Sequence, residues 1–525
     1  MIRSFLTVSS GTLVSRLLGF VRDSMIAALL GAGPVADAFL MAFQLINVVR
    51  RLLTEGALNA ALVPAWLRVR EAGGGGAAAT FAGRVLGTVS VTLVVIAALV
   101  GLSMPLVIAA LAPGFAGHET LRLAVEDARL MLPYLAFAGP VTVLMALLNA
   151  QGRFALTAFS PLLFNLTLIA ATSVLLFRET DAADAALAIA AAVGIAGLLQ
   201  LLTLAMRHGE AFASPLRAAS DAEMRGFFAK AIPGMIASAG PQLLVVAGAI
   251  IASSSTSAVS WLYFANRLIE LPLGIVGAAM STVLVPELTR TLRGDDPTSM
   301  IEAGSRGLEL AVALALPAAL GLIVLREPIV RALFQHGAFT AVDTAATAQA
   351  LMWLALALPA HVLVKAFSPA FFAREDTRTP LLATLTGFAV AIVSALLFGR
   401  LFGIEGIAAA IALGAWSSAV ALIRRGAQAF GFAVDAAARR RLPRIVVAAT
   451  VMGGLLWPEA RFVLPMTAEA HGAAQVAVVG ILIAGGIAIY GLLLVALGGI
   501  DGRDAARRIR QKAARDLRDK GAHGN

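Results

Sequence analysis

The chain has 525 residues, of which 59% are hydrophobic and only 14% are charged, which is the composition of a protein with many membrane spans. Cysteine is absent, which excludes disulfides, thiolate nucleophiles and zinc–thiolate sites, and the six histidines lack the spacing of metal ligands, so we expect neither a metal nor a cofactor. The formal net charge of +10 would suit a nucleic-acid-binding protein, so its distribution has to be considered first.

Apolar runs of about 20 residues, the length that crosses a bilayer, recur about fourteen times and define the predicted helices. They cover residues 6–30, 36–60, 86–112, 130–150, 157–177, 184–206, 228–252, 258–284, 306–325, 346–368, 380–400, 404–423, 443–460 and 474–498. The first run lacks a cleavage pattern and is too long for the apolar part of a signal peptide, so we interpret it as a retained helix. The sequence predicts an all-α polytopic membrane protein, with the four glycines at 73–76 in a connection between spans.

Positive charge alternates between the connections of these helices. One set of connections, together with the two termini, carries roughly 28 of the 41 lysines and arginines. Because positive loops stay in the cytoplasm, we expect both termini to be cytoplasmic and the number of spans to be even. The excess of basic residues is therefore explained by the membrane topology, and it does not indicate nucleic-acid binding.

Two similar strings indicate an internal repeat. ALVPAWLRVR ends the second span and VLVPELTRTLR ends the eighth, with Pro64 and Pro286 each followed four residues later by an arginine. The offset of about 220 residues contains six spans, so the two halves share one orientation, as in transporters built from parallel repeats. We predict an N-terminal lobe at 1–210, a C-terminal lobe at 222–425, two further helices within 442–500 and a basic tail at 501–525.

Charges lie inside the predicted spans, where each costs about 2.5–3.5 kcal/mol on insertion scales. They are Arg16, Arg22 and Asp23 in the first span, Asp37, Arg50, Arg51 and Glu55 in the second, Arg267 and Glu270 in the eighth, and Lys365 in the tenth. Helical spacing predicts local pairs of Arg51 with Glu55 and of Arg267 with Glu270. The remaining excess of arginine predicts a water-filled cavity that binds a phosphate-bearing anion. The alternative is that these arginines only snorkel or hold helices together.

Several strings of the sequence resemble one family. SRLLGFVRD, DAF at 37–39, NVVRRLLTEGAL, NRLIELPLGI, LFQHGAFT and FAREDTRTP occur in the order found in the MurJ/MviN lipid II flippases. The resemblance implies the fold of the MOP exporter superfamily, with two six-helix lobes and two C-terminal helices. It implies the transfer of lipid II, the undecaprenyl-pyrophosphate-linked peptidoglycan precursor, from the cytoplasmic to the periplasmic leaflet of a bacterial inner membrane.

The resemblance also implies site residues. The substrate-binding arginines would be Arg16, Arg22, Arg50 and Arg267, the gating or ion-pairing acids Asp23, Asp37, Glu55 and Glu270, and further cavity-lining residues Ser15, Arg51, Asn165 and Lys365. The last two spans would form a groove for the polyprenyl tail. Asn266 stands where some relatives carry an acid, and residues 231–252 and 381–398 contain no carboxylate, so the sequence gives no support for a sodium site in the second lobe.

The resemblance favours alternating access driven by the membrane potential, and no GxxxxGK[ST] loop for ATP is present. Three alternatives remain open at this point. They are a flippase for another polyprenyl-pyrophosphate glycan of the O-antigen type, an intramembrane enzyme acting on the same carrier, and a scaffold for cell-wall enzymes. Asp376 is the one tempting catalytic acid, and we interpret it as a helix cap or a loop ion-pair partner. The expected partners are lipid II, membrane lipids and other proteins of cell-wall synthesis.

Overall fold

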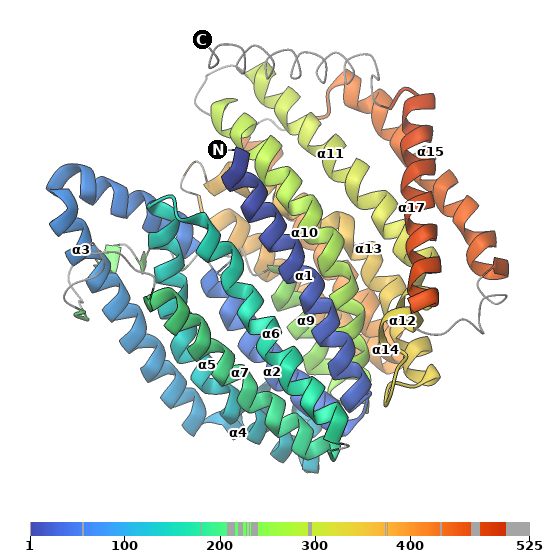
Figure 1. Ribbon diagram of the computed structural model, residues 1–525. Coiled ribbons are helices and arrows are strands. Elements are labelled where there is room, and N and C mark those ends of the chain that lie inside the picture. The colour runs from blue at the N-terminus through green and yellow to red at the C-terminus, as the bar shows by residue number, and fades with distance from the viewer. Residues whose placement is uncertain are drawn as a thin grey trace, which may run out of the picture. The chain divides into compact units, whose positions relative to one another are not determined.

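The computed structural model describes residues 2–54, 57–178, 180–206, 240–291, 297–372, 376–430, 433–463 and 473–499, with the short pieces 216–218, 224–226, 228–229, 232 and 374. Within these residues every regular element is a helix (Figure 1). The predicted all-α fold is confirmed. Glu55 and the tail at 501–525 lie outside the described residues.

The first part of the chain forms α1 (Ile2–Leu30), α2 (Pro34–Thr54), α3 (Ala57–Leu102), α4 (Met104–Leu111), the 3-10 turn η1 (Pro113–Phe115), α5 (Glu119–Ala150), α6 (Phe154–Arg178) and α7 (Ala182–Met206). The rest forms α9 (Gly240–Ala252), α10 (Ala258–Thr291), α11 (Pro297–Val324), α12 (Arg326–Phe334), α13 (Ala341–Phe372), α14 (Arg378–Phe430), α15 (Ala436–Pro458), the π-helical turn η2 (Glu459–Val463) and α17 (Ala473–Ala496). Eight of the described helices are long and apolar enough to cross a membrane. The described charges of the predicted spans lie on α1, α2 and α10, which are not among these eight, and on α13, which carries Lys365.

Two glycines divide the two longest helices. α3 continues through the glycine run that we predicted to be a connection, and only Gly74 leaves helical geometry, with φ 74° and ψ −173°. Because glycine has no Cβ, it takes up the bend in a single residue while its neighbours stay helical, so the connection between the two predicted spans contains a kink at Gly74. Gly403 does the same in α14, with φ 58°, between the predicted spans 380–400 and 404–423.

Asp376 accepts a hydrogen bond from the Thr379 amide at 3.0 Å at the start of α14, which confirms its interpretation as a cap.

The chain forms two compact units. The first comprises the described residues up to Leu271 together with Leu333–Ala357 and Arg374–Leu422. In this unit α1 lies against α6, and α5 lies against α2, α3 and α7. Its core includes the stacked rings of Phe39 and Phe43, 5.7 Å apart between centroids.

The second unit comprises Pro272–Ala332, Leu358–Ala373 and the described residues from Ile423 onward. Here α11 packs against α15, and α15 packs against α17, around a cluster that includes Met452, Leu456 and Leu494. Tyr490 of α17 donates a hydrogen bond to the Ala313 carbonyl of α11 at 2.7 Å. The predicted lobe boundaries stay a prediction.

Candidate functional site

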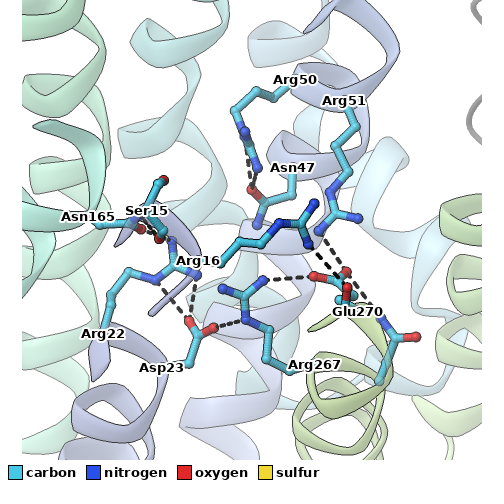
Figure 2. A network of polar contacts seen from close by, with 11 residues as sticks. Ser15, Arg16, Arg22, Asp23, Asn47, Arg50, Arg51, Asn165, Arg267 and Glu270 are labelled. Atoms are coloured by element: carbon cyan, nitrogen blue, oxygen red, sulfur yellow. Dashed lines mark hydrogen bonds and ion pairs between the residues drawn. The ribbon is translucent and has the colours of Figure 1, made fainter. Parts of the chain in front are cut away.

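The charged face of α1 follows from helical periodicity. Arg16, Gly19 and Asp23 are spaced by three and four residues, and Ser15, Gly19 and Arg22 are spaced in the same way, so both sets lie on one side of the helix. Arg22 and Asp23 are buried in the first unit. Figure 2 shows this face of α1 meeting side chains from α2, α6 and α10.

Asp23 lies between two guanidinium groups. Its Oδ1 pairs with Nη2 of Arg22 at 2.6 Å, and its Oδ2 pairs with Nε of Arg267 at 2.5 Å. The Asp23 side chain is fully buried, so its charge is stable only because both partners are close. Asp23 therefore connects α1 to α10.

Glu270, one turn after Arg267 on α10, also forms ion pairs with two arginines. Its carboxylate pairs with Nη1 of Arg267 at 2.7 Å and with Nη2 of Arg51 at 2.6 Å, and accepts a longer bond from Asn266 at 3.4 Å. The predicted pair of Arg267 with Glu270 is confirmed. For Arg51 the structure gives a pair with Glu270 of α10, and the partner that we predicted for it, Glu55, lies outside the described residues. Arg267 thus bridges the two carboxylates (Figure 2).

Arg22 is oriented by an amide and two rings. Its Nη1 donates to Oδ1 of Asn165 at 3.0 Å, and Nδ2 of Asn165 donates to the Ser15 carbonyl at 2.9 Å. The guanidinium carbon lies 5.1 Å from the ring centre of Phe43 and 5.7 Å from that of Phe164, within the range of cation–π attraction. The planar group is therefore held in one orientation from several sides.

Arg16 and Arg50 approach the same region. Arg16 donates from Nη1 to the Glu270 carbonyl at 3.2 Å. Arg50 donates to Oδ1 of Asn47 at 3.3 Å and lies 5.9 Å from the ring centre of Phe164. Sequence reasoning missed Asn47, although its spacing of three residues before Arg50 on α2 is a signal that could have identified it.

Gly19 makes room for Arg267. A Cβ atom added at Gly19 would meet Nη2 of Arg267, so only glycine lets the guanidinium pass this close to α1. The aromatic rings and Gly19 carry no sequence signal that separates them from ordinary helix packing.

We call the residues Arg16, Arg22, Asp23, Arg50, Arg51, Arg267 and Glu270 the arginine cluster. It contains five guanidinium groups and two carboxylates, so it is strongly positive. Arginine binds phosphate through paired hydrogen bonds and keeps its charge when buried, so this arrangement suits an anion with several phosphate oxygens. In the part of the chain that the structure describes, no group of three or more histidines or acids could hold a metal ion.

The two remaining predicted site residues are Asp37 and Lys365. The Asp37 carboxylate, in the first turn of α2, accepts hydrogen bonds from the amides of Ser257 and Ser260 at 2.7 and 2.8 Å and from the Ser260 hydroxyl at 2.5 Å. The described contacts of Asp37 are thus with serines at the start of α10, and its role as a gate stays a prediction. Lys365 lies on α13 in the second unit, one turn after the buried His361.

Comparison with known proteins gives one consistent result. A family model described as lipid II flippase MurJ matches residues 26–468. The probable lipid II flippase MurJ of Rhizobium meliloti (strain 1021) is 35% identical over 529 residues, which cover 100% of this chain and 99% of that protein. The lipid II flippase MurJ of Burkholderia cenocepacia is 32% identical over 79% of this chain and 81% of that protein.

Solved structures with a similar fold include a MurJ and a MATE family transporter. A lipid II flippase MurJ in an inward closed conformation aligns with a TM-score of 0.75 at 21% identity, over 93% of this chain and 98% of that chain. An inward-facing multidrug resistance MATE family transporter of the MOP superfamily aligns with a TM-score of 0.66 at 15% identity, over 82% of this chain and 98% of that chain. At these identities the likeness concerns the fold.

Proposed function

The chain belongs to the MurJ family of lipid II flippases, and on that premise we propose that it moves lipid II from the cytoplasmic to the periplasmic leaflet of a bacterial inner membrane. Lipid II joins a polyprenyl tail to a glycopeptide through a pyrophosphate. The observation that carries the proposal is the chain of ion pairs Arg22–Asp23–Arg267–Glu270–Arg51, which is fully buried at Asp23 and partly buried at Arg51, Arg267 and Glu270.

The two carboxylates hold the binding groups in place before substrate arrives. Asp23 and Glu270 keep Arg22, Arg51 and Arg267 close together, which like charges would otherwise oppose. A pyrophosphate carries more charge and more acceptor oxygens than either carboxylate, and it competes for the same guanidinium groups. Binding therefore exchanges internal ion pairs for pairs with the substrate, with little extra cost for removing water from the arginines.

The exchange of partners suggests how binding is coupled to movement. Arg267 and Glu270 belong to α10, whereas Arg22 and Asp23 belong to α1, so substrate that takes over Arg22 and Arg267 loosens the ion-pair connection between these helices. Alternating access follows when the helices close again around a neutralised site. With both termini in the cytoplasm, as the alternation of positive connections predicts, export moves an anion out of a negative interior. A potential of 100 mV favours that direction by about 2.3 kcal/mol per charge.

The proposal describes a transporter whose substrate leaves chemically unchanged. The polyprenyl tail would lie along α17, where Ile481, Ile487 and Leu492 are 67–71% exposed. Other proteins of cell-wall synthesis would supply and consume the substrate on the two sides of the membrane.

Transport by the purified full chain in liposomes tests the proposal. Fluorescent lipid II placed in one leaflet should appear in the other at a rate that rises when the potential drives anions in that direction. A polyprenyl-pyrophosphate carrying an O-antigen-type glycan serves as the competing substrate. Absence of lipid II transport, or preference for the second lipid under both potentials, would contradict the proposal.

A further inference from the structure

A groove lies beside the N-terminal end of α15, in the second unit. Its volume is about 760 Å³, and the residues that line it include Val434, Arg439, Leu442, Pro443, Val446 and Val447. Among the described lining residues Arg439 alone is charged, and the others are apolar. The groove therefore combines one cation with an apolar wall.

The groove is built on a fixed loop. The Ser305 hydroxyl of α11 donates to the Ala433 carbonyl at 3.0 Å and accepts a hydrogen bond from the Asp435 amide at 2.9 Å. Asp435 in turn accepts a bond from the Ala438 amide at 2.6 Å. These bonds fasten the segment before α15 to α11, so the groove exists before any ligand binds.

The arginines at the N-terminal end of α15 have different surroundings. Arg441 turns toward Glu309 of α11 at 3.5 Å, and Arg444 donates to the Gly498 carbonyl beyond the end of α17 at 2.9 Å. Arg439 is exposed and lines the groove. Its neighbour Arg440 is also exposed, but it is not among the described lining residues.

An apolar stripe continues from the groove along α15. Val447, Val451 and Leu455 follow one another at intervals of four residues, which places them on one face, and each is 41–49% exposed. Arg439 and the exposed Trp457 are separated by about 27 Å along the helix axis, close to the thickness of the hydrocarbon core of a bilayer. The sequence predicts a membrane span at 443–460, and on such a span this stripe faces acyl chains, with a cation at one interface and an aromatic ring at the other.

We infer that the groove binds an anionic phospholipid of the bilayer, with its phosphate on Arg439 and an acyl chain along Val446, Val447 and the stripe below them. A single arginine matches the charge of one phosphodiester, and basic sites on the cytoplasmic side of membrane proteins recognise such headgroups. The inference does not depend on lipid II transport. The orientation proposed above places the site in the cytoplasmic leaflet.

Photocrosslinking in liposomes tests the inference on the full chain. The probe is phosphatidylglycerol with a diazirine in the acyl chain near the glycerol, compared with phosphatidylcholine carrying the same group. Trypsin cleaves after Arg444 and Arg461, so an adduct on Val446 or Val447 appears in the peptide 445–461. We expect phosphatidylglycerol to label this peptide about fivefold more than phosphatidylcholine does, as one basic residue near an anionic headgroup allows.

Two variants make the test specific. Arg439→Gln should remove the preference for phosphatidylglycerol, whereas Arg440→Gln, the matched exposed arginine outside the described lining, should keep most of it. Labelling of the α17 peptide 462–503 should change in neither variant. Equal labelling by both lipids in the wild-type chain would overturn the inference, as would displacement of phosphatidylglycerol by unlabelled lipid II, which would assign the groove to the transported substrate. Both results are independent of whether the protein transports lipid II, so failure of this inference and failure of the proposed function can be distinguished.

Discussion

Arginine side chains have opposite surroundings in the arginine cluster and at the N-terminal end of α15. In the cluster, Arg22 is buried, paired with Asp23 and covered by two aromatic rings. At the N-terminal end of α15, Arg439 and Arg444 are exposed. Charge buried in a helix bundle must have a partner, whereas charge at a helix end reaches water or headgroups by its own length. The comparison supports the proposal that the cluster binds substrate, because a helix end can be anchored by exposed arginines that need no buried partner.

Loss of Asp23 should have the largest effect on stability. Asp23→Asn leaves Arg22 and Arg267 close together without the carboxylate that separates them, and breaking a buried pair costs about 3–5 kcal/mol. The matched change in the other region is Glu309→Gln, whose partner Arg441 is 39% exposed, and its cost should be about 0–1 kcal/mol. Thermal unfolding of both variants in detergent measures the difference. Similar unfolding temperatures of the two variants would contradict the claim that the ion pairs of Asp23 stabilise the fold more than the pair of Glu309 with Arg441.

Loss of Arg22 should have the largest effect on substrate binding. Arg22→Ala removes charge-assisted hydrogen bonds, each contributing about 1.5–3 kcal/mol, and lipid II affinity should fall by about tenfold to a hundredfold. Asp23 keeps its pair with Arg267 in this variant, so the protein should remain inserted and folded. Arg22→Lys should retain part of the activity, because lysine keeps the charge but not the planar fork.

Complementation of a flippase-depleted strain and unfolding in detergent, measured in parallel, check this prediction. The double variant Arg22→Ala with Asp23→Ala is the decisive control. Recovery of growth in the double variant would mean that the pair only holds helices together.

Gly19→Ala should disturb the cluster without changing any charge. The added methyl group displaces Nη2 of Arg267, and overpacking of this kind costs about 1–3 kcal/mol. Lipid II affinity should fall by about tenfold in a titration followed by native mass spectrometry. Gly485→Ala on α17, where an added Cβ meets no atom within 4 Å, is the matched control and should bind like the wild-type chain. Equal behaviour of the two variants would show that the position of Arg267 is unimportant.

Asn165→Ala should have the smallest of these effects. The change removes the acceptor of Arg22 Nη1 and the donor to the Ser15 carbonyl, while the pair of Arg22 with Asp23 remains. A hydrogen bond of this kind contributes about 1 kcal/mol net, so lipid II affinity should fall about fivefold, as measured by the same titration. A loss as large as that of Arg22→Ala would mean that Asn165 contacts the substrate directly.

Much of the fold was predictable from the sequence, because apolar runs of bilayer length stand out where only 14% of residues are charged. The short helix α12 was missed, since nine residues with two arginines and a glutamate do not resemble a span. The four glycines were predicted to lie in a connection between spans, but a glycine run does not show that the connection is a kink at one residue with helical neighbours.

The membership of the arginine cluster was predictable, but most of its pairings were not. Helical spacing identified the pair of Arg267 with Glu270, three residues apart. It could not identify the pair of Arg51 with Glu270, which are 219 residues apart and meet only through tertiary packing. Asp37 was expected among the arginines, and its serine partners at the start of α10 could not be inferred without the fold.

The central claim, that the arginine cluster binds the pyrophosphate of lipid II, is tested most directly by labelling Ser15→Cys. The native chain has no cysteine, so a methanethiosulfonate reagent reports on this position alone, beside Arg16 and Asn165. The account predicts that the new thiol is labelled from water, and that lipid II blocks the labelling while an uncharged polyprenol of equal length does not. A thiol that stays unlabelled, or equal protection by both lipids, would contradict the claim.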